Sequence, residues 1–320
     1  MLRTPLIYLS KADWARNIVT RWPVAWRVAS RFVAGDHLED AVRAIQALND
    51  HGINATLDHL GEHTTTEQEA RQACDEVTNI LDVIQQNGLR ANVSIKLSQI
   101  GLNLDLELCA DNLECILAKA RSLGNFVRID MEDSPRVDKT LDLYWMMRGV
   151  NGLDNTGVVL QSYLYRTEAD LKAILIKGGR VRLCKGAYKE PAEVAYPKKT
   201  DVDANYDRLA RQLIEGALEM GCPTLSEDGR IPPIPAIASH DERRIEFARN
   251  LAMQLGLPKQ AIEFQMLYGI RRDIQERLVG DGYPVRVYVP YGTEWYPYFV
   301  RRLAERPANI WFFVSNFFKN

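Results

Sequence analysis

The chain has 320 residues, of which 46% are hydrophobic, 26% charged and 9% aromatic, and its formal net charge is −2. This composition is typical of a soluble globular protein with one large α/β domain or two smaller ones. The near-neutral charge argues against nucleic acid as a partner of the whole chain, and no apolar run approaches the roughly 20 residues of a membrane-spanning helix.

Cysteine usage indicates the compartment. The five cysteines form no C-x-x-C pair, and their number is odd: Cys74, Cys109, Cys115, Cys184 and Cys222. This pattern is typical of a reducing cytosol and argues against a disulfide framework or a structural zinc site. Because no signal peptide is visible either, the sequence predicts a cytoplasmic protein.

Residues 1–35 differ from the rest of the chain because they carry six cations and one acid. Trp14, Ile18, Trp22 and Trp26 recur every four residues, although Pro23 must break or restart a helix there. A basic helix with a tryptophan stripe could lie on an anionic membrane surface. We favour packing on the protein itself or on a second subunit, because apolar stripes are usually buried. A second helix is predicted at about 36–50, so that residues 1–50 form an N-terminal helical segment.

From residue 51 onward, strand-like runs alternate with helical patterns. The predicted strands are 53–57, 91–97, 126–131, 157–161, 181–184, 234–239, 262–266 and 285–289. The helical patterns that follow them are 66–86, 106–122, 136–149, 167–177, 202–220, 241–255, 270–280 and 294–305. Such alternation predicts parallel strands joined by crossover helices. Eight units over about 250 residues match a (βα)8 barrel, which we assign to residues 51–320.

An open, doubly wound sheet is the competing fold, but no G-x-G-x-x-G or Walker motif is present to support it. The longest connection, 187–202, is rich in Pro, Lys and Tyr, and we expect it to lie over the barrel mouth. Pro290 and Gly292 are expected to end the last strand.

Polar residues interrupt the apolar strands near their carboxyl ends, where barrel enzymes place their active sites. Lys96, Asp130 and Arg182 lie near the ends of three different strands. Because a charge inside a strand is costly unless it is paired, their common position predicts a functional site. The excess of cations there predicts that the site binds one or more anions.

Arg301 and Arg302 stand next to each other on the last predicted helix. Two fixed guanidinium groups near the end of a strand could bind a small carboxylate. The alternative is a solvated helix face on which Glu305 pairs with Arg301.

Asp58, His59 and His63 follow the first strand and suggest a metal site, as in metal-dependent barrel hydrolases. Helical His-x3-His spacing does not apply, because Gly61 is expected in a turn. Further ligands at later strand ends are not obvious, so a metal-dependent hydrolase remains the alternative enzyme, and a non-catalytic binding protein for a small amino acid is a third possibility.

Six segments in the order of the chain resemble the proline dehydrogenase family: VSIKLSQIG (93–101), RIDMED (128–133), LQSYLYRT (160–167), VRLCKGAYKE (181–190), EFQMLYGI (263–270) and RVYVPYGTEWYPYFVRRLAER (286–306). The resemblance implies a distorted (βα)8 barrel with the last helix over the active-site mouth. It implies oxidation of L-proline to Δ1-pyrroline-5-carboxylate by hydride transfer to N5 of a non-covalent FAD, the first step of proline catabolism to glutamate.

The resemblance also implies partners. Electrons would pass to ubiquinone or a similar membrane quinone, which suggests peripheral contact with the inner face of the cell membrane. A pyrroline-5-carboxylate dehydrogenase would act downstream. The length leaves no room for the extra modules of bifunctional relatives, so the chain looks like the monofunctional bacterial form.

Residue by residue, the resemblance implies the following roles. Arg301, Arg302 and Lys96 would bind the proline carboxylate, and Asp130 would orient these cations. Tyr288 and Leu267 would enclose the proline ring, and Arg182 would lie beside flavin N5. Further flavin contacts would come from Met131, Gln161, Lys185, Gly186, Ala187, Ser239 and His240. The family often has threonine at the position of Ser239, and both residues supply a hydroxyl group.

Overall fold

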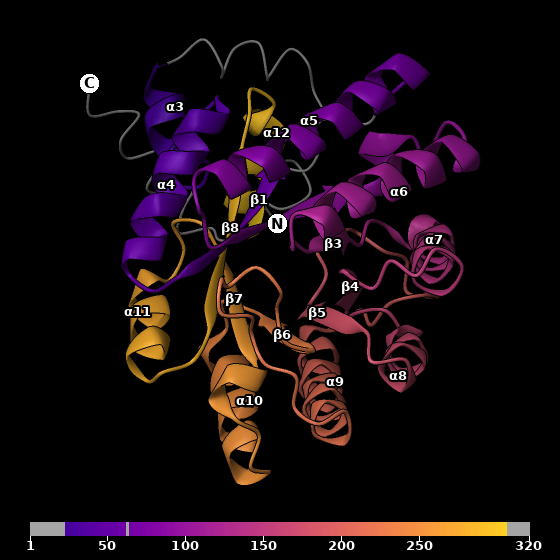
Figure 1. The fold of residues 1–320 in the computed structure, drawn as a ribbon. Helices are drawn as coiled ribbons and strands as arrows, with labels where there is room; N and C mark the ends of the chain where they lie inside the picture. The colour runs from indigo at the N-terminus through magenta and orange to yellow at the C-terminus, as the bar shows by residue number, and fades with distance from the viewer. Residues whose placement is uncertain (1–22, 62–63, 306–320) are drawn as a thin grey trace.

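The computed structural model describes residues 23–61 and 64–305, which form a closed barrel of eight parallel strands surrounded by helices (Figure 1). The strands follow one another around the barrel in sequence order, and β8 closes it by pairing with β1. The predicted (βα)8 barrel is therefore confirmed. No helix in these described ranges is long and apolar enough to cross a membrane.

Each predicted strand is present, with bounds that differ from the prediction by two residues at most. The strands are β1 (Asn54–His59), β2 (Ala91–Lys96), β3 (Val127–Asp130), β4 (Thr156–Gln161), β5 (Arg180–Cys184), β6 (Pro235–Ala238), β7 (Glu263–Leu267) and β8 (Val285–Tyr291). Nearly every strand residue is buried, because side chains face either the barrel interior or the surrounding helices. Continuous burial explains why these strands read as apolar runs in the sequence.

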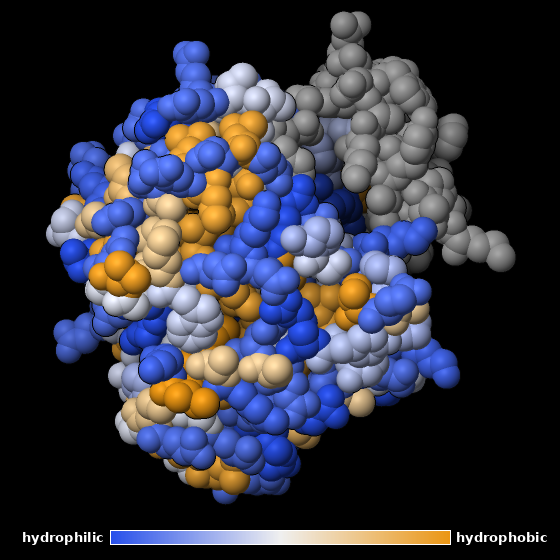
Figure 2. All heavy atoms as spheres, turned by 90° about the vertical axis from the view of Figure 1, so that its right-hand side faces the viewer, coloured by the Kyte–Doolittle hydropathy of each residue, from blue (hydrophilic) through white to orange (hydrophobic). Residues whose placement is uncertain are grey.

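The helices of the barrel also lie close to the predicted ranges. They are α5 (Glu67–Gln86), α6 (Leu106–Ser122), α7 (Val137–Gly149), α8 (Thr167–Ile176), α9 (Lys199–Glu219), α10 (Glu242–Gln254), α11 (Arg272–Gly280) and α12 (Trp295–Glu305), preceded by α3 (Pro23–Ala29) and α4 (Leu38–Asp50). Side-chain oxygens of Thr66, Asp105 and Asp241 cap α5, α6 and α10. The outer face in Figure 2 is a mixture of polar side chains and smaller apolar patches, as expected for helices that face solvent.

Two of the differences from the predicted boundaries have a clear physical reason. Helix α9 begins at Lys199 rather than 202, where the Lys199 ammonium pairs with Asp203 one turn later and supports an additional turn. Strand β8 continues through Pro290 to Tyr291. Proline lacks an N–H group but keeps its carbonyl, and the Pro290 oxygen accepts a hydrogen bond from Ala34 N at 2.9 Å.

A second layer of charged groups lies inside the barrel, below the mouth. Glu263 of β7 and Arg286 of β8 form a fully buried ion pair, with Arg286 Nε 3.0 Å from both carboxylate oxygens. Arg286 also donates to the carbonyl oxygen of Gly229, in the loop between α9 and β6, at 2.6 Å. A side chain could not replace Gly229, because its φ is +70° and a Cβ would lie 2.3 Å from Asn54 Oδ1. This loop therefore packs directly against the floor of the barrel.

The segment before the barrel packs on the helix after it. Val28, Phe32 and other apolar residues of segment 26–33 share an apolar cluster with α12, which we call the outer cluster. The rings of Trp26 and Trp295 lie 5.3 Å apart, and those of Phe32 and Phe299 lie 6.4 Å apart. For residues 26–33 the structure therefore agrees with packing on the protein itself. Trp14, Ile18, Trp22 and the aromatic tail at 311–318 lie outside the described residues.

Candidate active site

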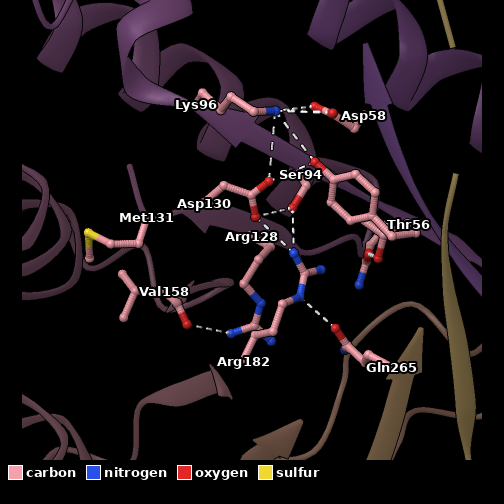
Figure 3. Close-up of polar contacts among 12 residues, drawn as sticks. Thr56, Asp58, Ser94, Lys96, Arg128, Asp130, Met131, Val158, Arg182 and Gln265 are labelled. Carbon is pink, nitrogen blue, oxygen red and sulfur yellow. Dashed lines mark hydrogen bonds and ion pairs between the residues drawn. The ribbon is translucent and has the colours of Figure 1, made fainter. Parts of the chain in front are cut away.

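Polar side chains from five strands, four of them charged, meet at the carboxyl end of the barrel (Figure 3). Lys96 lies opposite Asp130 in the β2–β3 register, and Arg182 reaches the same place from β5. The predicted convergence of Lys96, Asp130 and Arg182 is thus confirmed. The structure adds Asp58 of β1 and Tyr288 of β8 to the group.

Asp130 is the centre of this group. Its Oδ1 accepts hydrogen bonds from Arg182 Nη1 at 2.8 Å and from Ser94 Oγ at 2.8 Å, and its Oδ2 accepts one from the Tyr288 hydroxyl at 2.7 Å. Lys96 Nζ is 3.9 Å from Oδ2. One carboxylate therefore fixes a guanidinium, two hydroxyls and an ammonium relative to one another.

Lys96 has a closer partner that the sequence did not indicate. Its ammonium lies 2.9 Å from Oδ1 and 3.0 Å from Oδ2 of Asp58, a residue that is only 1% exposed. Burial raises the pKa of Asp58, and the charge of Lys96 opposes that shift. Burial would lower the pKa of Lys96, but the charges of Asp58 and Asp130 outweigh it, so its pKa is raised. Lys96 is therefore held as a cation.

The residues that suggested a metal site have other partners. Asp58 pairs with Lys96, and His59 Nδ1 lies 2.9 Å from Glu76 Oε2 on α5. Among the described residues no group of three or more His, Cys, Asp or Glu side chains could hold a metal ion, and His63 lies outside them. The structure thus gives no support to a metal-dependent hydrolase.

Arg182 is almost completely enclosed by polar partners and an aromatic ring. Besides Asp130, its Nη1 donates to Ser94 Oγ at 3.0 Å and its Nε donates to Gln265 Oε1 at 2.5 Å. Its guanidinium carbon lies 5.3 Å from the centre of the Tyr288 ring. Arg182 is thus held in one position by contacts on three sides.

The arginine pair of α12 is less enclosed than the strand cations. Arg301 is exposed and Arg302 is half-buried, with its guanidinium carbon 5.0 Å from the centre of the Tyr298 ring. Although the residue is exposed, protein atoms crowd its head group and lower the pKa of Arg301 first, and the charge of Arg302 lowers it second. An anionic ligand between these cations would relieve their repulsion.

Tyr188, in the loop between β5 and α9, was not predicted as a site residue. Burial and the charge of Glu132 raise its pKa to about 12, while the positive charges of Lys96 and Arg301 act against that shift. Its hydroxyl therefore lies in the field of both cations, which agrees with the expectation that this loop lies over the mouth. The only sequence signal for Tyr188 was its place in that loop.

Residues expected to contact a flavin lie at or after the ends of β3, β4, β5 and β6. Gln161 Nε2 donates to the carbonyl oxygens of Met131 and Glu132, whereas its buried Oε1 has no hydrogen-bond partner. His240 Nε2 accepts from Leu267 N at 2.9 Å, which links the ends of β6 and β7. The neutral ring then carries its proton on Nδ1.

The remaining expected flavin contacts follow β5 and β6. Lys185 Nζ lies 2.5 Å from Asp203 Oδ1 and 2.6 Å from Asp241 Oδ2, two acids that the sequence did not single out. Gly186 has a φ of +106°, and a Cβ there would lie 2.5 Å from the Tyr163 ring. Ser239 Oγ accepts from Asp241 N, and Ala187 follows Gly186 into the loop.

Comparison with known proteins gives concordant results. The sequence model of a family described as "Proline dehydrogenase" matches residues 41–314. A proline dehydrogenase of Deinococcus radiodurans is 42% identical over 297 residues, which cover 92% of this chain and 91% of the relative. Proline dehydrogenase 1 of Bacillus subtilis is 38% identical over 323 residues, which cover 100% of both chains.

A solved structure also matches. The crystal structure of proline utilization A from Bdellovibrio bacteriovorus inactivated by N-propargylglycine has a TM-score of 0.79 and 26% sequence identity to this chain. The match covers 91% of this chain and 34% of that protein, so this chain spans about a third of its length.

Proposed function

Because the chain belongs to the proline dehydrogenase family, we propose that it oxidises L-proline to Δ1-pyrroline-5-carboxylate with FAD bound at the barrel mouth. The observation that carries the proposal is the fixed group of Asp58, Lys96, Asp130, Arg182 and Tyr288 below a pair of arginines. It provides cations for a small carboxylate and a separate, enclosed cation for the redox cofactor. Family membership makes the protein an oxidoreductase.

The residues at the mouth fit a flavin. The buried Gln161 Oε1 lacks a partner, and an unpaired buried acceptor is costly unless a ligand supplies a donor. The N–H group of the flavin pyrimidine ring is such a donor. Gly186 lets the backbone pass closely over Tyr163, and Ala187, Met131, Ser239 and His240 would complete the flavin contacts. Lys185 would position the ends of α9 and α10 through its two carboxylates.

The proline carboxylate would be bound by cations that the protein holds in different ways. Lys96, fixed by Asp58, would bind the proline carboxylate from below, and Arg301 and Arg302 would bind it from α12. Binding by three cations fixes the ring in one orientation, while Tyr288 and Leu267 would enclose its apolar atoms. Asp130 would keep Lys96, Tyr288 and Arg182 at constant separations.

The cofactor would supply the hydride acceptor, N5 of FAD, and the residues of the chain would hold proline with its C5 toward that acceptor. Arg182 would stabilise the negative charge that the reduced cofactor carries, because a fixed cation in a water-poor site stabilises developing charge. Arg182 would serve the cofactor rather than the carboxylate, because its Nε and Nη1 are already bound to protein groups. Closure of α12 over proline would exclude water.

The electron acceptor would be ubiquinone or a similar membrane quinone, reached through peripheral contact with the membrane. The product would pass to a pyrroline-5-carboxylate dehydrogenase. Both assignments come from the family and not from the geometry of the site.

The absorption spectrum of the purified protein tests the proposal. We expect flavin bands that bleach when L-proline is added without oxygen, and that return when a soluble quinone is supplied. D-Proline is the control, because its carboxylate cannot occupy the same place while C5 faces the flavin. A colourless protein with stoichiometric zinc would contradict the proposal in favour of a hydrolase. Flavin-free binding of proline would indicate a binding protein.

A further inference from the structure

The mouth of the barrel is connected to its floor by a continuous chain of buried polar groups. Gln265 of β7 is 5% exposed and bridges the two levels. Its Oε1 accepts from Arg182 Nε at 2.5 Å, and its Nε2 donates to Glu263 Oε2 at 2.6 Å. Glu263 in turn binds Arg286. The chain therefore runs from the cation proposed to act on the flavin to the ion pair inside the barrel.

The lower end of this chain is fixed to backbone. Arg286 Nη1 donates to the carbonyl oxygen of Ala55 and Nη2 to that of Gly229, both at 2.6 Å. Arg286 is 1% exposed and Glu263 is 0% exposed. Neither can shift without leaving buried groups unsatisfied, so the ion pair is a rigid base.

Hydrogen-bond chemistry allows only one arrangement of the Gln265 amide. An arginine only donates and an ionised glutamate only accepts, whereas an amide does one of each at its two ends. With Glu263 on one side and Arg182 on the other, the amide nitrogen must face Glu263 and the oxygen must face Arg182. A flipped amide would place two donors together and two acceptors together. Glu263 therefore sets the orientation in which Gln265 can bind Arg182.

Arg182 needs such a restraint because a buried cation, Arg128, repels it and a buried anion, Glu263, attracts it. Arg128, two residues before Asp130 on β3, is also fully buried, and its Nη1 donates to the carbonyl oxygens of Val158 and Arg180. Burial first, and the charge of Arg182 second, lower the pKa of Arg128 well below its usual value. The like charges of Arg128 and Arg182 repel each other, while Glu263 would draw Arg182 downward if Gln265 were not between them.

We propose that Gln265 is a positioning residue that fixes the height of Arg182 in the barrel, and that Glu263 and Arg286 keep its amide in the required orientation. The floor of the barrel thereby sets the distance between the Arg182 charge and the cofactor. This inference rests on the proposed function, because it takes Arg182 as the cation beside the flavin. Gln265 itself contacts neither substrate nor any reacting atom.

The test is the midpoint potential of the bound flavin in a Gln265→Met variant, measured by spectroelectrochemical titration. Methionine keeps the length of the side chain but neither hydrogen bond. Arg182 Nε and Glu263 Oε2 then lose their common partner, and the fixed Glu263 carboxylate attracts Arg182 toward the floor of the barrel, so the cation recedes from the flavin. We expect a lower potential than in the parent and flavin reduction by proline slower by about 10- to 100-fold, the range seen when partners that orient metal ligands are removed.

Asn92→Leu is the matched control. Asn92 is also a buried amide that accepts one hydrogen bond, from Thr56 Oγ1 at 2.6 Å, and donates one, to Arg230 O at 2.9 Å. Its loss should reduce the free energy of unfolding about as much as the loss of Gln265, but it should leave the flavin potential unchanged. A purely structural role for Gln265 predicts the same result for both variants.

A second variant, Gln265→Glu, keeps an acceptor for Arg182 and adds a negative charge beside it. Because its other oxygen faces the Glu263 carboxylate in place of a donor, this variant should lose stability, and its negative charge should lower the flavin potential by neutralising the cation. The inference is overturned if both Gln265 variants have the potential of the Asn92→Leu control. If the parent protein carries no flavin that proline bleaches, the proposed function fails, and this inference fails with it; a parent that bleaches normally confines any failure to Gln265.

Discussion

Two sets of cations meet at the barrel mouth, and they are held in different ways. Lys96 and Arg182 project from strands and contact the carboxylates of the buried Asp58 and the half-buried Asp130 at 2.9 and 2.8 Å. Arg301 and Arg302 project from α12, which packs against α3 through the aromatic rings of the outer cluster. The strand cations are thus set in place before a ligand arrives, whereas the position of the arginine pair depends on one packed helix. This difference suggests that the strands serve the chemistry and that α12 serves substrate capture.

Arg302→Ala should give the largest effect on the α12 side of this comparison. Removing one partner of a desolvated charge pair costs about 2–5 kcal/mol, so proline capture should weaken by about 30-fold to several thousand-fold, at about 1.4 kcal/mol per factor of ten. Arg302→Lys should restore only part, because an ammonium cannot make the forked contact. The measurement is kcat/KM for proline.

Two controls accompany Arg302→Ala. The FAD content should not change, because α12 is assigned to the substrate. Tetrahydro-2-furoic acid keeps the ring and carboxylate of proline but lacks the amine, so its binding isolates the carboxylate contact. If the variant binds this analogue as tightly as the parent does, the arginine pair is a solvated helix face.

Arg182→Met should impair flavin reduction and leave substrate binding intact, the opposite of Arg302→Ala. Removing one preorganised charge that stabilises the reduced state typically slows a reaction by about 10²–10³-fold, so flavin reduction should slow by that order and the flavin potential should fall. Binding of the unreactive analogue should stay nearly constant. An equal loss of analogue binding and of reduction rate would make Arg182 a substrate ligand and remove the distinction between the two sets.

Phe32→Ala tests whether the outer cluster places the arginine pair. Phe32 is 8% exposed and packs on Phe299 of α12. A looser α12 should raise KM for proline by about tenfold, which corresponds to about 1.4 kcal/mol, and should leave the flavin potential unchanged. Met147→Ala removes a buried side chain of α7, away from α12, and should lower stability without raising KM. Equal KM values in the two variants would show that the outer cluster does not affect the capture of proline.

The pH dependence should be the smallest effect. Asp58 and Asp130 raise the pKa of Lys96 against the opposing effect of burial, and burial followed by Asp130 raises that of Tyr288. Lys96 therefore stays charged and Tyr288 stays neutral as the pH rises from 6 to about 9, since both unperturbed pKa values are already near 10. We expect kcat/KM to rise with pH only as the proline amine loses its proton. If the pH at which kcat/KM rises is shifted in Tyr288→Phe, the titrating group belongs to the protein and not to proline.

The barrel was predictable because continuous burial leaves a direct record in the sequence. Strands covered on both faces are apolar runs, and their carboxyl ends all lie at one end of the barrel, so the convergence of Lys96, Asp130 and Arg182 followed from order alone. The sequence predicts too short a last strand, because a proline usually ends a strand, whereas Pro290 stays in β8 and only its missing N–H group is a constraint.

The partners inside the barrel could not be predicted in the same way. Asp58 binds Lys96, and Gln265 joins Arg182 to Glu263, through contacts that depend on the stagger of the strands rather than on spacing in the chain. A signal was present, because Glu263 and Arg286 are charged residues within apolar strands and must therefore be paired. The sequence alone did not say with which residues.

The outer cluster has a consequence for the order of folding. It joins residues near 30 to residues near 300, so it closes a loop that contains the whole barrel. Contacts of such high sequence separation carry a large loop-closure entropy and form late. During synthesis, Val28, Phe32 and their neighbours must wait for Trp295 and Phe299 while every strand is already made. The arginine pair would thus reach its place last, after the strands that line the proposed cofactor site have formed. A chain interrupted before α12 would leave an apolar surface open to aggregation.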